Sequence, residues 1–348
     1  MTAPTAPHHQ FLASHTVGDV LLEKKTRNDQ PLIDIHVTTT VEKVFETLLV
    51  NDILSVPVYR NFNNVKDYVA IIDAYDLLSS LEEQGFSFES ESPPDTEVLS
   101  MPVAVLVGMT NSSSKLWTCQ PTLPLNQLIE MFTKHRVHRV LVLDELPPRP
   151  DIGITDGDNS ASDEDNDPPR RQPNGRLVSQ TDVIRFLLEH NHQLGPILDI
   201  SADKAAGQAL KYAREYLGAT TADHLKSTPA SISIHHQAWS ALQTMSTAHA
   251  SCVAIVDADG GLVAEMSAAD LRGINPKRIH DLTRPVLVYL KTSQGSLKRP
   301  LSCREKFSLG QILSGVVRNH SHRSWLVDDE DRPIGCITLS DILAMFLE

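Results

Sequence analysis

Two His-Arg pairs, His138-Arg139 and His322-Arg323, occupy matching positions in the sequence. Each pair opens an apolar segment that ends on an aspartate six residues after the histidine. An arginine fork and a histidine donor together can neutralise an anionic group such as a phosphate. Because neighbouring side chains of a strand point to opposite faces, we expect one member of each pair to face a cleft and the other to contact a neighbouring element. The alternative is a solvated His-Arg pair beside an acidic neighbour.

A hydroxyl-rich turn that leads into a helix follows each of these segments. The start of a helix offers unpaired backbone N–H groups to phosphate oxygens, and an ionised aspartate can accept hydrogen bonds from two adjacent hydroxyls of a sugar. The same residues also suit ordinary helix capping without a ligand, so both interpretations stay open. The candidate ligands in the two turns are Ser179, Thr181 and Asp182, and Thr338, Ser340 and Asp341.

The two segments belong to an internal repeat with four copies. In the third copy 13 residues separate the strand-end Asp257 from the turn Asp270, and the same 13 separate Asp328 from Asp341 in the fourth. The third copy keeps Ser267 beside its turn aspartate but has no basic pair before its strand. We therefore interpret the third copy as a partial site.

The second copy is longer because it carries an insertion. Its strand-end Asp144 and turn Asp182 are 38 residues apart, an excess of 25. The excess corresponds to residues 146–173, whose Pro, Asp and Ser content buries too little apolar surface to offset the entropy of ordering. We predict a disordered loop there. Ser160 and Ser162 precede an acidic run, which is compatible with phosphorylation or with an unmodified solubilising loop.

The first copy departs most from the pattern. Its turn, Asp73–Asp76, contains a second carboxylate where the other copies have a hydroxyl. A negative charge at that place would repel a phosphate. We therefore expect no anionic ligand centred on the first copy.

Each copy begins with a short strand and an amphipathic helix. In the helix predicted at 41–50, the apolar positions 41, 44, 45, 48 and 49 define one face. The corresponding helices are predicted at 125–134, 237–247 and 309–318, and the short strands at 32–35, 117–119, 232–234 and 287–290. The β-branched apolar strands predict an α+β fold in which helices cover small sheets.

Composition argues against several classes of protein. The net charge of −13 is unfavourable for binding nucleic acid or an anionic membrane. The four cysteines form no CxxC pair and the histidines suit the surface, so we expect neither a disulfide framework nor a metal site. With no secretory signal and no apolar run near the ~18 residues of a membrane span, we expect a soluble protein of the cytoplasm or nucleus. No motif of a nucleotide-dependent enzyme or hydrolase occurs.

The pattern of strand, turn, strand, Ser/Thr-x-Ser/Thr-Asp and helix resembles the CBS domain across nearly all of residues 15–348. Four copies in two pairs resemble two Bateman modules. The resemblance divides the chain into a disordered tail (1–14), module one (15–190, with repeats at about 16–85 and 98–190), a connecting helix or linker (191–222, with the helix at 204–217) and module two (223–348, with repeats at about 223–278 and 280–348).

The two His-Arg pairs are similar to those of the gamma regulatory subunit of AMP-activated protein kinase and its fungal and plant relatives. The resemblance implies repeats paired about a pseudo-twofold axis, with AMP, ADP or ATP in the clefts and the turn aspartates as ribose ligands. It implies a regulatory ligand rather than a required cofactor, and no catalysis. The partner that it implies is a Ser/Thr protein kinase complex.

The sequence departs from that family at two places. Leu54 stands where the family often has an arginine, and Asp182 is retained where the gamma subunits lose the turn aspartate. We therefore expect up to two nucleotide sites, using Asp182 and Asp341. The alternative is a CBS-domain scaffold or inhibitor with empty clefts, which acts through protein-protein contacts alone.

Overall fold

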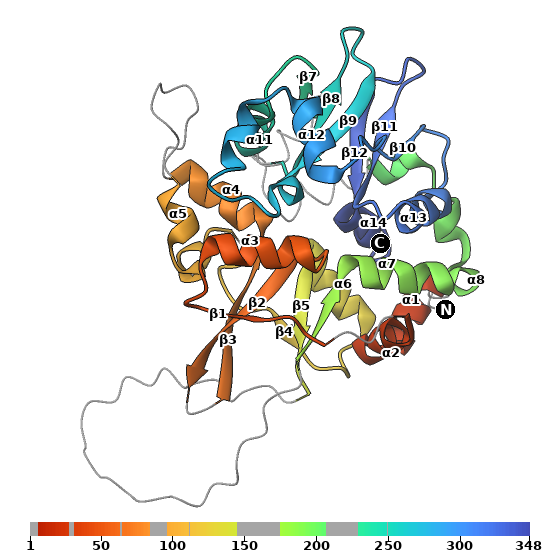
Figure 1. Cartoon of the computed structure of the whole chain (residues 1–348). Helices are drawn as coiled ribbons and strands as arrows, with labels where there is room; N and C mark the ends of the chain where they lie inside the picture. The colour runs from red at the N-terminus through yellow and green to blue at the C-terminus, as the bar shows by residue number, and fades with distance from the viewer. Residues whose placement is uncertain are drawn as a thin grey trace, which may run out of the picture.

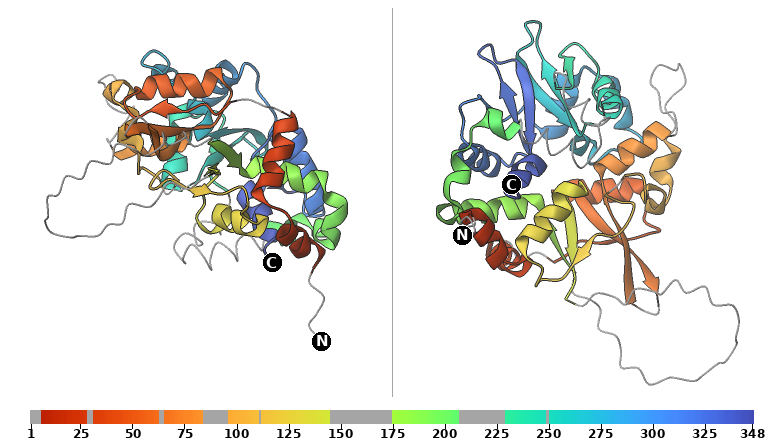
Figure 2. Two further views of the ribbon diagram at one scale, coloured as in Figure 1. Left: turned by 90° about the horizontal axis from the view of Figure 1, so that it is seen from below. Right: turned by 180° about the vertical axis from the view of Figure 1, so that it is seen from behind.

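The computed structural model describes residues 6–27, 31–62, 65–83, 96–110, 112–144, 175–206, 229–248 and 250–348. Each of the four repeats contributes one three-stranded sheet. The sheets of repeats one and two lie at one end of the molecule, those of repeats three and four at the other, and helices lie between them (Figure 1). The view from behind in Figure 2 shows the same two halves. The α+β class is confirmed.

The four repeats follow one order of elements. Repeat one consists of β1 (Ile35–His36), α3 (Val41–Val50), β2 (Ser55–Phe62), β3 (Val65–Asp73) and α4 (Ala74–Glu83). Repeat two consists of β4 (Thr118–Cys119), α6 (Leu125–Lys134), β5 (Arg139–Val142), β6 (Arg176–Ser179) and α7 (Gln180–Glu189). Repeat three consists of β7 (Ser231–Ser233), α11 (Ala238–Thr247), β8 (Cys252–Val256), β9 (Leu262–Ser267) and η3 (Ala268–Leu271). Repeat four consists of β10 (Ser302–Cys303), α13 (Leu309–Arg318), β11 (Arg323–Val327), β12 (Pro333–Thr338) and α14 (Leu339–Met345).

The remaining helices precede or connect the repeats. They are α1 (Pro7–Ser14), α2 (Val17–Arg27), α5 (Glu97–Ser100), η1 (Val103–Leu106), α8 (Asn191–Leu194), η2 (Gly195–Asp199), η4 (Ile279–Thr283) and α12 (Val286–Gln294). Within the described ranges, none of the helices combines the length and the apolar character needed to cross a membrane.

The strand register brings the basic pairs next to the turns. In every sheet the short first strand runs parallel to the second, and the second runs antiparallel to the third. The first residue of the second strand lies opposite the residue that begins the turn. These pairs are Ser55 with Asp73, Arg139 with Ser179, Cys252 with Ser267, and Arg323 with Thr338.

The segment before each repeat packs against the other repeat of its half. Four isolated β-bridges join such segments to the start of a repeat's first helix, and each bridge has two backbone hydrogen bonds of 2.7–3.0 Å. Within each half, the segment before each repeat bridges to the first helix of the other repeat. This reciprocal contact is what a pseudo-twofold pair requires. The bridges are Thr16 with Pro124, Thr40 with Pro102, Ser201 with Ser308, and Gln237 with Pro285.

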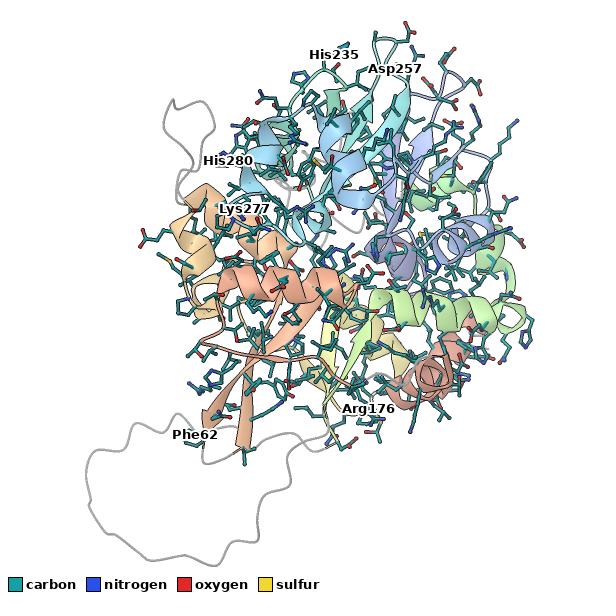
Figure 3. The ribbon with its side chains drawn as sticks, viewed as in Figure 1. Phe62, Arg176, His235, Asp257, Lys277 and His280 are labelled. Atoms are coloured by element: carbon teal, nitrogen blue, oxygen red, sulfur yellow. The ribbon has the colours of Figure 1, made fainter. Side chains whose placement is uncertain are left out.

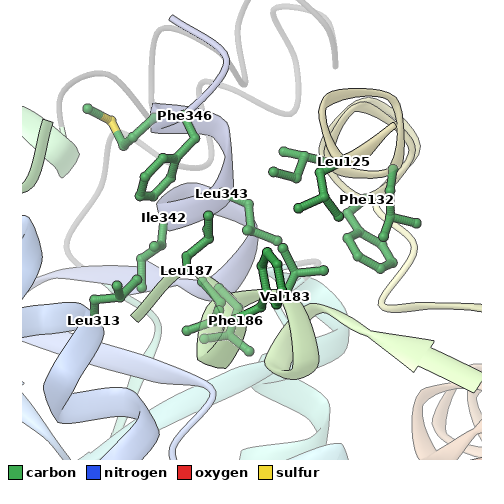
Figure 4. Close-up of a cluster of buried hydrophobic side chains, with 14 of the residues drawn as sticks. Leu125, Phe132, Val183, Phe186, Leu187, Leu313, Ile342, Leu343 and Phe346 are labelled. Atoms are coloured by element: carbon green, nitrogen blue, oxygen red, sulfur yellow. The ribbon is translucent and has the colours of Figure 1, made fainter. Parts of the chain in front are cut away.

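Two large apolar cores cross from one half to the other. One core joins repeat one to repeat three, and the second joins repeat two to repeat four. Figure 4 shows the second core, where Phe186 and Val183 of α7 pack with Leu343 of α14. Smaller clusters lie between the sheets of repeats one and two, around Leu141, and between those of repeats three and four, around Trp325. Each repeat therefore contacts one neighbour through its sheet and another through its helices.

Two predictions of local structure were wrong. Residues 7–14 form α1 instead of a disordered tail, because Phe11 and Leu12 are buried in the core of repeats two and four. Residues 287–290 belong to α12, and the short strand of repeat four is β10. A short apolar run is compatible with either structure, and Pro285 before it favours the start of a helix.

Other predictions fall partly outside the described residues. The loop at 146–173, with Ser160 and Ser162, lies outside them, as does the helix at 204–217 beyond residue 206. Residues 202–206 are helical, and Ala202 is buried in the core of repeats two and four. The linker therefore begins within the packed part of the protein.

Candidate functional site

The turn aspartates of repeats two and four cap the helices that follow them. Oδ2 of Asp182 accepts hydrogen bonds from the backbone N–H and the hydroxyl of Ser179 at 2.9 and 2.7 Å. Oδ2 of Asp341 accepts the equivalent bonds from Thr338 at 2.8 and 2.7 Å. Both hydroxyls in return accept a hydrogen bond from the aspartate N–H, which completes a capping box. Helix capping is therefore present, and it engages one oxygen of each carboxylate.

Asp76 of repeat one is fully buried and has protein partners at both oxygens. Its Oδ2 accepts from the backbone N–H of Asp73 at 2.9 Å, and its Oδ1 accepts from the hydroxyls of Thr110 and Ser113 at 2.7 and 2.5 Å. Burial and the negative charge of Asp73 raise the pKa of Asp76 to about 7. Both oxygens of Asp76 are already used by protein hydrogen-bond donors, so this turn is a poor candidate for a ligand site.

Asp270 of repeat three is also held at both oxygens. The backbone N–H of Ser267 donates to Oδ2 at 2.8 Å, and Nε2 of Gln294 donates to Oδ1 at 2.7 Å. Burial raises the pKa of Asp270. Gln294 comes from α12, part of which the sequence pattern predicts as a strand, so the pattern does not predict this contact.

Lys24 of α2 occupies the turn of repeat two. Its Nζ lies 2.8 Å from Oδ2 of Asp182 and donates to the carbonyl oxygen of Leu177 at 2.9 Å. The Asp182 side chain retains only 9% of its exposure, so the ion pair is largely shielded on that side. The two residues are 158 positions apart in the chain, so no local sequence pattern predicts this contact.

Asp341 has fewer partners than the other turn aspartates. Among the residues that the structure describes, Thr338 is its one hydrogen-bond donor. Burial raises the pKa of Asp341, and the Thr338 hydrogen bonds and the charge of Arg136 oppose the rise. The adjacent Ser340 hydroxyl accepts a hydrogen bond from Nε2 of Gln180 at 2.9 Å, so the turns of repeats two and four adjoin.

The arginine of the first basic pair points toward repeat one. The carboxylates of Asp73 and Asp182 act on the partly buried Arg139 guanidinium and oppose the fall in its pKa that burial causes. His138 lies nearby, with its Nδ1 3.9 Å from Oδ2 of Asp73. Burial alone would raise the pKa of Asp73, but the adjacent His138 and the charge of Arg139 hold that pKa below its usual value. The second carboxylate of the first repeat is thus neutralised by the second repeat.

The arginine of the second basic pair points toward repeat three. Arg323 is buried, and its Nη1 lies 3.5 Å from Oε2 of Glu265. The same oxygen accepts a hydrogen bond from the indole Nε1 of Trp325 at 2.6 Å. Arg139 and Arg323 therefore lie at equivalent strand positions, but in the first pair His138 and Arg139 both act on Asp73, so that pair does not show the separation expected from strand alternation.

His322 lies where basic groups of three repeats converge. His322 stays partly open to solvent, but the protein around its ring displaces water and lowers its pKa, and the positive charges of Arg139, Arg323, His138 and Arg272 lower it further, to about 3. The imidazole is therefore neutral at physiological pH. Two further arginines lie here that no sequence motif indicates: Arg272 pairs with the exposed Asp52 at 3.0 Å, and the charge of Arg136 acts on Asp341.

The strand-end aspartates serve the outer turns of the sheets. Oδ1 of Asp257 accepts hydrogen bonds from two backbone N–H groups of its own turn at 3.0 and 2.8 Å, and Oδ1 of Asp328 does the same at the same two distances. Figure 3 shows Asp257 at the tip of its half, away from the helices. Asp257 and Asp328 recur at the same place in their repeats because each stabilises the turn between the second and third strands. Across the ranges that the structure covers, no group of three His, Cys, Asp or Glu side chains could hold a metal ion.

Comparisons with known proteins agree with this architecture. Residues 296–348 match the family described as the CBS domain. A SNF1-related protein kinase regulatory subunit gamma-like protein of Arabidopsis thaliana is 21% identical over 378 residues, which cover 96% of this chain and 95% of that protein. The 5'-AMP-activated protein kinase subunit gamma of Saccharomyces cerevisiae is 30% identical over 107 residues, or 30% of this chain and 33% of that protein.

A solved structure extends the likeness to the whole fold. A protein of Methanocaldococcus jannaschii, described as a proposed archaeal homolog of g-AMPK, has a TM-score of 0.58 at 18% identity and covers 92% of this chain and 97% of its own. This likeness supports the fold alone. In sequence the chain is therefore similar to CBS-domain proteins through residues 296–348, and over almost its whole length to a protein named as a gamma-like regulatory subunit.

Proposed function

We propose that this protein is a non-catalytic regulator that binds an adenine nucleotide between its repeats and transmits occupancy to a protein partner. The observation that carries the proposal is the convergence of Arg139, Arg272 and His138 around His322. Positive charges that meet in a partly buried region repel one another, and a polyanion would relieve this repulsion. Phosphate groups of AMP, ADP or ATP are suitable anions.

The ribose position that we propose is the turn of repeat four. Asp341 accepts hydrogen bonds through Oδ2 from Thr338, which leaves Oδ1 to accept from a ribose hydroxyl. Arg136 faces the same carboxylate and, with Arg139 and His322, could contact the phosphates. In this proposal Arg323 acts indirectly, because it is engaged by Glu265.

The partner that we propose is a Ser/Thr protein kinase complex, in the cytoplasm or nucleus. This part of the proposal is supported by the gamma-like relatives, whose names describe kinase subunits. A ligand that bridges repeats stabilises the arrangement that it fits best, and a partner that contacts several repeats can respond to this arrangement.

Calorimetric titration of the full chain with AMP, ADP, ATP and S-adenosylmethionine tests the proposal. We expect at least one adenine nucleotide to bind, and at 100 times its dissociation constant to stabilise the fold by about 2.7 kcal/mol. If no nucleotide at millimolar concentration gives heat or raises the melting temperature, the proposal of a sensor fails. If a nucleotide does bind, affinity purification of the protein in its presence and in its absence tests the kinase partner separately.

The second candidate is a scaffold or inhibitor whose clefts stay empty. The observation in its favour is that all four turn aspartates already cap their own helices. A protein of this kind would bind its partner equally well with and without nucleotide. The titration therefore separates the two candidates.

A further inference from the structure

Two cysteines from different repeats meet between the sheets of repeats three and four. Cys252, the first residue of β8, is buried beside Trp325 and Val327, and Cys336 of β12 packs against the same cluster. Both cysteines are free, and the two thiols lie close enough for each to shift the pKa of the other. Cys336 is partly exposed, whereas Cys252 is buried.

The surroundings of the thiol pair are charged. The groups that face Cys252 are Cys336, Arg323 and Glu265. The adjacent Cys336 thiol lowers the pKa of Cys252, and the positive charge of Arg323 lowers it further, against the opposing effects of burial and of Glu265. The Arg323 Nε is buried and makes no hydrogen bond within the described part of the chain. An arginine beside a thiol that has a second thiol within reach is the environment of a peroxide-reactive cysteine.

We propose that Cys252 and Cys336 form a reversible disulfide when a hydroperoxide reaches this interface. The Cys252 thiolate attacks one oxygen of hydrogen peroxide, the O–O bond breaks, and the departing hydroxide takes a proton to become water. The resulting sulfenic acid then reacts with the Cys336 thiol to give the S–S bond and a second water. Overall, two thiols are oxidised and one peroxide is reduced to two waters.

The equivalent interface between repeats one and two lacks this chemistry. By the strand registers, the position of Cys252 corresponds to Ser55, and that of Cys336 corresponds to Leu177. The thiol pair is therefore a property of one half of the molecule. A disulfide there would fix repeats three and four to each other independently of any nucleotide, since it needs no ligand.

Peroxide treatment of the full chain followed by peptide mapping without reductant tests the proposal. We expect a Cys252–Cys336 cross-linked peptide, loss of two of the four free thiols, a higher melting temperature, and reversal by dithiothreitol. Cys336→Ala and Cys252→Ala should each abolish the cross-link, whereas Cys303→Ala, a matched control at another buried cysteine, should retain it. Peroxide that produces only sulfinic or sulfonic acid, or cross-links between chains, would overturn the proposal.

The role of the charges is tested by rate. Arg323→Gln should slow cross-linking several-fold at neutral pH and shift its pH profile upward, because the thiolate loses a neighbouring positive charge. If this variant does not fold, Glu265→Gln provides the opposite change and should accelerate cross-linking. Equal rates in the wild type and in the folded variants would contradict activation of the thiol by its surroundings.

Discussion

Nζ of Lys24 lies 2.8 Å from Oδ2 of Asp182, so a residue of the N-terminal helix α2 supplies the cation for the turn of repeat two. The same oxygen also accepts the two hydrogen bonds from Ser179. A nucleotide bound at this turn would have to share the Asp182 carboxylate with the Lys24 ammonium group. The turn of repeat four has no such lysine among the described residues, which makes the two matched turns unequal.

The first prediction concerns the energy of this ion pair. In a double-mutant cycle, Lys24→Met and Asp182→Asn should show a coupling of about 1 kcal/mol, because the carboxylate is buried but the Lys24 side chain is 37% exposed. Urea denaturation of the four proteins measures it. The exposed pair of Lys43 with Glu46 serves as a control and should give a smaller coupling. A coupling of zero at Asp182 would mean that Lys24 does not hold this turn.

The second prediction concerns nucleotide affinity. Asp341→Asn should weaken the best adenine nucleotide at least tenfold, which corresponds to about 1.4 kcal/mol, because the ribose loses a charged acceptor. Asp182→Asn should lower stability and change affinity less. The matched control is Asp329→Asn at a fully exposed loop position, and calorimetry measures all three. The reverse ranking of Asp182 and Asp341 would refute our choice of turn.

The third prediction concerns the pH dependence of stability through Asp76. Its pKa of about 7 in the folded protein lies above the usual value of 3.8, so the folded state binds the proton more tightly than the unfolded state. The stability from this proton is complete below about pH 4 and is lost as the pH rises toward 7. Asp76→Asn, which stays neutral, should remove a loss on the order of 4 kcal/mol between these values.

Chemical denaturation of the wild type and Asp76→Asn at several pH values measures this difference. Asp73→Asn is a suitable comparison, because the pKa of Asp73 is lowered in the folded protein and its contribution should instead be lost as the pH falls. An unchanged pH profile in Asp76→Asn would show that Asp76 titrates near its ordinary value.

The repeated pattern predicted the sheets, the helices and the turns, because strand alternation, helical periodicity and capping residues are local properties of the chain. The 13-residue spacing from Asp328 to Asp341, for example, reports one hairpin turn and one strand. The contact between Lys24 and Asp182 is not local, and an apolar helix face does not specify which helix will cover it. The pairing of α7 with α14 across the halves could therefore not be read from the sequence.

For a related reason, the sequence does not predict which residue of each His-Arg pair faces the neighbouring repeat. Strand alternation predicted that the two members would separate, but it could not identify the member that faces the other sheet. In the structure Arg323 faces Glu265 in the second pair, whereas His138 and Arg139 both act on Asp73 in the first. Arg136 and Arg272 escaped notice because neither belongs to a repeated motif of the sequence.

The fourth prediction concerns the N-terminal helix. Phe11 is buried and its ring lies 5.8 Å from that of Phe186, so Phe11→Ala should destabilise the fold by about 3 kcal/mol through the cavity that it leaves. Leu22→Ala, at a residue that is 65% exposed, should change stability by less than about 0.5 kcal/mol. Denaturant unfolding measures both. Equal and small effects would indicate that α1 does not dock on the core of repeats two and four.

The fifth prediction concerns His322. Its folded-state pKa of about 3 lies below the usual value of 6.5, so its contribution to stability is complete above pH 6.5 and is lost as the pH falls toward 3. His322→Asn should remove this loss, by no more than about 1 kcal/mol because the residue keeps access to solvent that screens its charge. Imidazole NMR signals measure the pKa directly. Bound nucleotide should raise it, since phosphate favours the charged ring.

The control for His322 is two positions earlier in the same loop. His320 is exposed, and its backbone φ of 51° suits asparagine, so His320→Asn removes an imidazole without strain. His320→Asn should leave both the acid limb of the stability curve and the nucleotide affinity unchanged, whereas His322→Asn should alter both. If nucleotide leaves the His322 signals in place while it binds with unchanged affinity to His322→Asn, the phosphates do not lie at the convergence of the basic groups.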